Sequence, residues 1–93
     1  MKTSITIISP AMEVHKAGCA DIARTLRNGY TKTFGQAEDS TTYSGETLDE
    51  AILAANKDLA AWFGEEYGTP EAEAAGCWTV AACHQAPCFR SLR

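Results

Sequence analysis

The side chains best suited to chemistry lie in two short segments near opposite ends of the chain. The first reads His15-Lys16-Ala17-Gly18-Cys19 and the second reads Cys83-His84-Gln85-Ala86-Pro87-Cys88. Thiolates and imidazoles are the ligands that zinc prefers in tetrahedral structural sites. If the first and last strands of the fold are neighbours, His15 comes close to the second segment. The candidate metal ligands are His15, Cys19, Cys83, His84 and Cys88.

The spacing of these residues argues against a conventional zinc knuckle. The chain has no Cys-x-x-Cys pair, and five residues separate Cys77 from Cys83. Adjacent residues of a strand, such as Cys83 and His84, point to opposite faces. Cysteine is also commonly a small buried hydrophobic residue, which is the alternative for Cys19 and Cys83. The sequence therefore assigns no metal and no other cofactor, and a small zinc-binding module stays an alternative.

A cysteine nucleophile is a further alternative from the same residues. A nearby imidazolium or a helix N-terminus favours the reactive thiolate, and Cys19 is the best placed because it lies near the start of a predicted helix. Nothing in the sequence identifies a third, orienting residue or an oxyanion hole. The glycines form no phosphate-binding loop, and no His-Glu-x-x-His segment is present. We assign no catalytic residue, and a cysteine-dependent enzyme or redox protein is the least favoured hypothesis.

Length and composition predict one globular domain spanning residues 1–93. The 93 residues leave no room for a second core, and 45% hydrophobic with 22% charged residues is typical of a soluble globule. The apolar run at residues 5–8 is too short for a signal peptide or a membrane span. We expect a cytoplasmic protein, in which the four cysteines are thiols or metal ligands rather than a disulfide framework.

The charge is unevenly distributed along the chain. Residues 1–37 carry five bases and two acids, whereas residues 38–73 carry ten acids and one base within a net charge of −4. Nucleic-acid binding requires several lysine and arginine contacts to phosphates, so this distribution predicts no nucleic-acid partner. The acidic segment is interpreted mainly as a solvated helix face.

The elements that would position the two segments begin with a strand over residues 3–8. This strand ends at Ser9-Pro10 or continues at a sheet edge through residues 13–15. A three-and-four spacing of apolar residues predicts a helix over residues 16–28, which Asn28-Gly29 ends. Residues 30–34 and 41–44 are rich in β-forming residues and predict a hairpin.

The second half of the chain gives the clearest helix signal. Thr47 and Glu50 fit a capping box, in which the Thr47 hydroxyl accepts from the Glu50 amide and the Glu50 carboxylate accepts from the Thr47 amide. An apolar stripe follows, and Gly64 or Gly68 ends the helix. A last strand is predicted over residues 78–84, with its end marked by Pro87. The stripe consists of Leu48, Ile52, Ala55, Leu59 and Trp62.

This order of elements, β-α-β-β-α-β, predicts an α+β fold. It is a small two-layer sandwich of the split βαβ, ferredoxin-like kind, with two helices on one face of an antiparallel sheet. The other face is then solvated or buried by a partner, and a homodimer through it is one expectation. Aromatic side chains at the sheet and at the helix end are candidates for partner binding. They are Tyr30, Phe34, Trp62, Tyr67 and Trp78.

The two chain ends also carry a resemblance. Residues 14–23 (VHKAGCADIA) and 86–92 (APCFRSL) resemble small uncharacterised accessory proteins of actinobacterial phages, mycobacteriophages included. The resemblance implies a viral protein made during infection that binds a host or phage protein in the host cytoplasm. It carries over no catalytic or ligand-binding residue. The leading hypothesis is therefore a non-enzymatic interaction module, without a nucleic-acid or membrane partner.

Overall fold

A four-stranded mixed sheet forms the centre of the computed structural model, which describes residues 2–32, 35–67, 80 and 84–90, with the backbone alone for 59–67 and 90. Strands β1 (Thr3–Pro10), β2 (Glu13–Lys16), β3 (Ala37–Gly45) and β4 (His84–Gln85) lie in the order β3-β1-β2-β4. β1 pairs antiparallel with β2 and β3, whereas β2 pairs parallel with β4. The helices are α1 (Ala20–Asn28), α2 (Leu48–Tyr67) and α4 (Pro87–Arg90).

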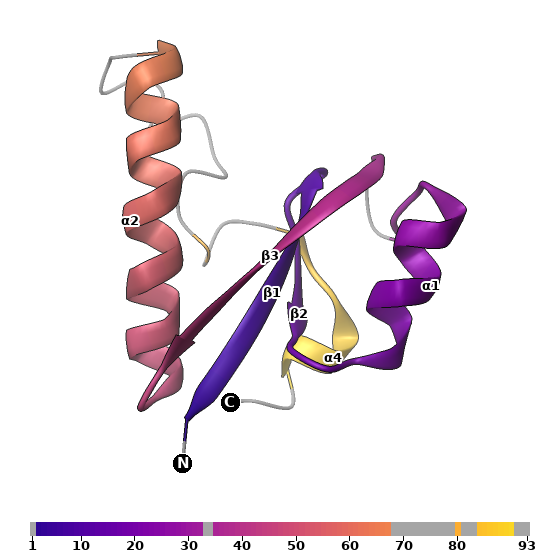
Figure 1. The fold of residues 1–93 in the computed structure, drawn as a ribbon, viewed down its shortest axis with the longest axis horizontal. Helices are drawn as coiled ribbons and strands as arrows, with labels where there is room; N and C mark the ends of the chain where they lie inside the picture. The colour runs from indigo at the N-terminus through magenta and orange to yellow at the C-terminus, as the bar shows by residue number, and fades with distance from the viewer. Residues whose placement is uncertain (1, 33–34, 68–79, 81–83, 91–93) are drawn as a thin grey trace.

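The predicted α+β class is confirmed, but the arrangement of elements differs from the expectation. The described order is β-β-α-β-α-β-α, and the parallel β2–β4 pair makes the sheet mixed rather than antiparallel. The helices are not gathered on one face, because α1 lies on the side of the sheet opposite to α2 (Figure 1). No helix in the described ranges is long and apolar enough to cross a bilayer.

The first strand and its return strand set the two faces of the sheet. β1 continues to Pro10, and the chain then turns at Met12, which has a positive φ of 59°. The predicted end of this strand at Ser9-Pro10 is confirmed, and the alternative of a strand running on through residues 13–15 is wrong, because β2 folds back and lies between β1 and β4. Alternation along the paired strands assigns side chains to two faces. One face carries Ile5, Ile7 and Val14, and the other carries Thr6, Ile8, Glu13 and His15.

The apolar core lies on the first of these faces, under α2. Ala51 and Ala55 of α2 are fully buried against it, with Leu48 and Ile52 partly buried beside them. The helix begins directly after β3, and a Cβ on Gly45 would lie 2.6 Å from the Ala51 nitrogen. Glycine is therefore required where the strand meets the helix. The remaining core residues are Val80 and Phe89.

The predicted cap of α2 is half confirmed. The Glu50 amide donates to the Thr47 hydroxyl at 3.2 Å, as expected. The Glu50 carboxylate accepts instead from the Glu46 amide at 2.7 Å, one residue earlier than the capping box predicts. The helix ends at Tyr67, directly before Gly68, and Gly64 lies within it.

The first helix is shorter than the apolar spacing predicts. It begins at Ala20 rather than Lys16 because Gly18 has a φ of +83°, which a helix does not allow. Its end is confirmed, since Gly29 is left-handed and its amide donates to the Thr25 carbonyl. The strand expected at residues 30–34 is wrong for the part described, where Tyr30 makes an isolated bridge to Gln36. Residues 33–34 lie outside the described part.

The last predicted strand is much shorter than expected. Of residues 78–84, only His84 belongs to a described strand, while residues 78–79 and 81–83 lie outside the described part. The strand ends before Pro87, as predicted, and α4 begins there. The Ala86 amide donates to the Val14 carbonyl at 3.0 Å, so the chain runs alongside β2 into α4.

Candidate metal centre

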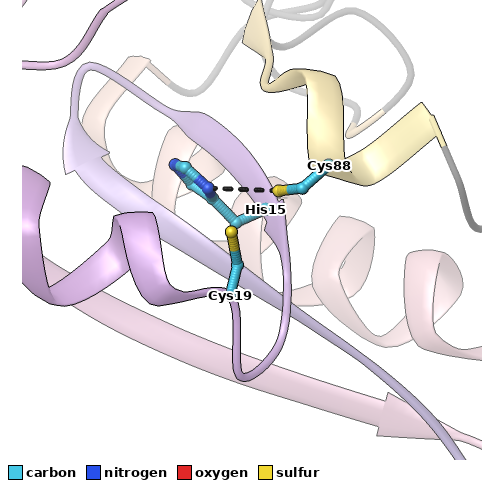
Figure 2. Close-up of side chains that lie close together, drawn as sticks. All are labelled: His15, Cys19 and Cys88. Atoms are coloured by element: carbon cyan, nitrogen blue, oxygen red, sulfur yellow. Dashed lines mark hydrogen bonds between the residues drawn. The ribbon is translucent and has the colours of Figure 1, made fainter.

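Three ligand-type side chains from three separate elements meet beside the end of β2. His15, Cys19 and Cys88 each offer one donor atom, and these atoms all lie within 4.8 Å of one another. Figure 2 shows the imidazole and the two thiols converging from β2, the start of α1 and α4. Both cysteines are half-buried and the histidine is buried. The group joins residues that lie far apart in the sequence, since His15 and Cys88 are separated by 73 positions.

The local structure on each side of the group follows from short sequence features. The Cys19 amide donates to the Lys16 carbonyl at 3.1 Å, and the positive φ of Gly18 makes this a type II turn between β2 and α1. Cys19 is the N-cap residue of α1, and its side chain makes no capping hydrogen bond. The turn thus places the Cys19 thiol next to β2 and leaves it available to a ligand.

Cys88 is held against the same strand by the backbone. The Lys16 amide approaches the Cys88 sulfur at 3.4 Å, and Phe89, the next residue of α4, is fully buried in the core. Cys88 therefore lies beside the end of β2. The short β4 is what brings α4, rather than a strand, next to His15.

A buried carboxylate fixes the orientation of the His15 ring. Glu13 and His15 share the same face of β2, and the Nε2 atom of His15 lies 2.6 Å from Oε1 of Glu13. Their side chains are only 2% and 3% exposed, respectively. A carboxylate can only accept a hydrogen bond, so Nε2 is the donor and Nδ1 is left facing Cys88. A metal-ligating histidine characteristically donates its second N–H to such a carboxylate.

The Cys88 thiol lies 3.4 Å from Nδ1 of His15. Burial raises the pKa of this thiol above its ordinary value, the Lys16 amide opposes the rise, and Cys19 and Asp21 add to it. Without a cation, the thiol therefore stays protonated at neutral pH. A second thiol and an acidic side chain near the Cys88 sulfur form an arrangement that a bound cation would stabilise.

The donor set fits a zinc-type ion. Zinc–sulfur bonds of about 2.3 Å and zinc–nitrogen bonds of about 2.0–2.1 Å place tetrahedral ligand atoms roughly 3.3–3.8 Å apart. The 3.4 Å separation of Cys88 Sγ and His15 Nδ1 already lies in that range. The remaining separations, within 4.8 Å, require a closure on the order of 1 Å. Thiolate and imidazole ligands together select zinc or a related transition metal.

The structure groups some of the five predicted ligands and not others. His15, Cys19 and Cys88 come together, whereas His84 lies exposed on β4 and is not part of the described group. Cys83 lies outside the described residues. Glu13 was not predicted as a site residue, although its i,i+2 spacing from His15 on a strand places both side chains on one face.

The structure describes the side chain of only one of the five aromatic residues predicted to bind a partner. Tyr30 is 65% exposed, which agrees with a surface role. Trp62 and Tyr67 lie in α2, where only the backbone is described. Phe34 and Trp78 lie outside the described residues. Leu53, which the sequence analysis did not single out, is 55% exposed.

Comparisons with family models, with curated proteins and with solved structures found no match to this chain.

Proposed function

We propose that this protein is a small zinc-binding module, with His15 Nδ1, Cys19 Sγ and Cys88 Sγ as ligands. The observation that carries the proposal is the convergence of these three donor atoms within 4.8 Å from β2, the N-cap of α1 and α4. The Glu13 hydrogen bond to Nε2 supports it, because that bond presents Nδ1 as the ligating atom. The chain ends that carry the phage-protein resemblance contain all three ligands.

One observation favours metal binding over a thiol nucleophile. A Cys88–His15–Glu13 line is also the order of a nucleophile, a base and an orienting acid. Both uses require the Cys88 thiolate, so the burial that raises the pKa of this thiol does not distinguish them. A nucleophile, however, gives no role to Cys19, whose sulfur lies in the same group. A metal ion uses both thiols.

The test is metal analysis of untagged, reduced protein purified without chelator, followed by competition with a chromophoric chelator. We expect about one zinc ion per chain. Replacing His15 with alanine, or Cys19 or Cys88 with serine, removes one ligand and weakens binding by at least about 100-fold, since even outer-shell changes cost about 10–100-fold.

His84→Ala is the matched control, because it removes the second histidine of the chain, which is exposed. This variant keeps full zinc content and affinity. A wild-type protein that folds without metal and gains no stability on zinc addition contradicts the proposal. So does a His15→Ala variant that binds as tightly as the His84→Ala control.

The hypothesis of a phage-type accessory protein that binds a host or phage protein stays a prediction. The exposed Tyr30 supports a surface of this kind. The two hypotheses are compatible, because a metal that ties α1 and α4 to β2 would stabilise the fold that presents such a surface. We propose the cytoplasm as the setting, since thiols remain reduced there.

A further inference from the structure

The two thiols of the His15–Cys19–Cys88 group lie close enough to react with each other. Their sulfur atoms are within 4.8 Å, and they are not joined by a disulfide. A disulfide bond of about 2.05 Å requires the sulfurs to approach by less than about 3 Å. Both cysteines are half-buried, so a small oxidant reaches the sulfurs, whereas His15 is buried beneath them.

The local backbone permits that approach. The Cys19 carbonyl accepts from the Ile22 amide at 3.1 Å, but the Cys19 side chain makes no capping hydrogen bond, so rotation of that side chain breaks no helix bond. Gly18 before it has open space around its Cα, with no atom within 4 Å of a Cβ built there. Cys88 lies on a helix of only four residues. The pair can therefore close without disturbing the sheet.

We propose that oxidation joins Cys19 and Cys88 in a reversible disulfide that expels the metal ion. This inference rests on the proposed function, since it gives the zinc site a redox control. Two of the three described ligands are consumed together by one bond, and the remaining imidazole of His15 is too weak a site to retain zinc alone.

The reaction balances with hydrogen peroxide as the oxidant. One thiolate sulfur attacks peroxide, the O–O bond breaks, and a sulfenic acid forms with release of hydroxide. The second thiolate attacks that sulfur, the S–S bond forms, and a second hydroxide leaves. The two sulfurs lose two electrons and the peroxide gains two. With two protons from solvent the products are the disulfide, two waters and an unchanged Zn²⁺ ion.

The experiment follows zinc and thiols in the same sample. A Cys77→Ser, Cys83→Ser background leaves Cys19 and Cys88 as the two thiols of the chain. Zinc content is measured first, and a small molar excess of hydrogen peroxide is then added with a chromophoric zinc indicator. We expect two thiols lost per zinc released, and recovery of both after reduction and zinc addition.

Peptide mapping of the unsubstituted protein identifies the bond. Trypsin yields residues 17–24, which contain Cys19, and residues 58–90, which contain the other three cysteines. We expect these two peptides to become linked, with fragmentation placing the link at Cys88. A Cys19→His variant keeps a zinc ligand at this position but cannot form the Cys19–Cys88 disulfide, so we expect it to retain zinc under peroxide. If this variant does not fold, Cys88→His takes its place in the experiment.

The outcomes separate the two proposals. Reduced protein that holds no zinc overturns the proposed function, and the redox control with it. Protein that binds zinc and keeps it under peroxide, or that links Cys19 to Cys77 or Cys83, overturns the redox inference and leaves the zinc site standing. Zinc loss from Cys19→His at the wild-type rate also overturns the inference.

Discussion

The two faces of the sheet bury different chemistry. Under α2, the side chains of Ile5, Ile7 and Val14 belong to one cluster of buried apolar groups. On the opposite face, a carboxylate and an imidazole, Glu13 and His15, are buried to the same degree. The hydrophobic effect alone accounts for the first arrangement. The second removes two polar groups from water, and their mutual hydrogen bond, together with the contact of His15 Nδ1 to Cys88 Sγ, offsets part of that cost.

Within the short strand β2, different residues contribute to the stability of the core and to the candidate metal site. Val14 lies between Glu13 and His15 in sequence, yet it points to the core on the other side. A strand can therefore anchor itself with one residue and hold a ligand with its two neighbours. Polar groups buried at this cost are most simply explained by a site that needs them rigid.

The largest effect is expected on the apolar face. Ile5→Ala leaves a cavity beside Ala51 and lowers the free energy of unfolding by about 2–5 kcal/mol. The measurement is urea denaturation of the zinc-loaded protein. Zinc content of the folded fraction stays at about one per chain, because Ile5 faces away from the ligands. A loss of zinc without a loss of stability would contradict the separation of the two faces.

A smaller effect, on metal affinity, is expected on the polar face. Glu13→Gln keeps the size of the side chain but removes the carboxylate that orients His15, and zinc affinity falls by about 10–100-fold. Chelator competition measures it, with Glu38→Gln on exposed β3 as the matched control. Equal zinc affinities for the two variants would contradict the proposal that Glu13 orients His15.

The next effect is expected at the turn between β2 and α1, which contains Gly18. Gly18→Ala forces an L-residue into a φ of +83° and costs about 1 kcal/mol of stability, although nothing lies close enough to clash. Because Gly18 positions Cys19, zinc affinity falls as well. Gly29→Ala is the control, since it meets the same φ penalty at the far end of α1. Both variants lose stability, and only Gly18→Ala loses affinity.

The smallest effect concerns a polar contact at the rim of the apolar face. The Tyr43 hydroxyl of β3 donates to the Asp58 carboxylate of α2. Burial, with Asp58 adding to it, raises the pKa of Tyr43 from 10.0 to about 12. The folded state therefore holds this proton more tightly than the unfolded state. The resulting stability is complete below pH 10 and is lost as the pH rises through about 12.

Tyrosinate absorbance of the three tyrosines measures this titration. Asp58→Asn lowers the pKa of Tyr43 part of the way towards 10, because burial, the first cause, remains. Zinc content is unchanged in that variant. A Tyr43 that titrates near 10 in the wild-type protein would contradict the β3–α2 contact.

Local signals predicted α1's end and α2's cap, but not the sheet topology. Gly29 and Thr47 act through neighbours a few residues away, so their roles are readable from sequence. The parallel pairing of β4 with β2 depends on two residues that carry no register signal of their own. The β1–β2 hairpin was not predicted, because its left-handed turn residue is Met12, and methionine rarely adopts a positive φ.

The site was predictable in its residue types and not in its geometry. His15, Cys19 and Cys88 were candidates from chemistry alone, but their spacing of 4 and 69 residues matches no local zinc motif. Only the β2–β4 pairing, which carries α4 alongside β2, brings Cys88 to His15. His84 was excluded by the same pairing, which leaves it exposed on β4.

The most direct test is X-ray absorption at the zinc edge on reduced, zinc-loaded protein. We expect two sulfur ligands at about 2.3 Å and at least one imidazole nitrogen at about 2.0–2.1 Å. The imidazole signal disappears in His15→Ala and persists in His84→Ala. A shell of four sulfurs, or one of nitrogen and oxygen alone, would contradict the proposal that His15, Cys19 and Cys88 form the metal centre.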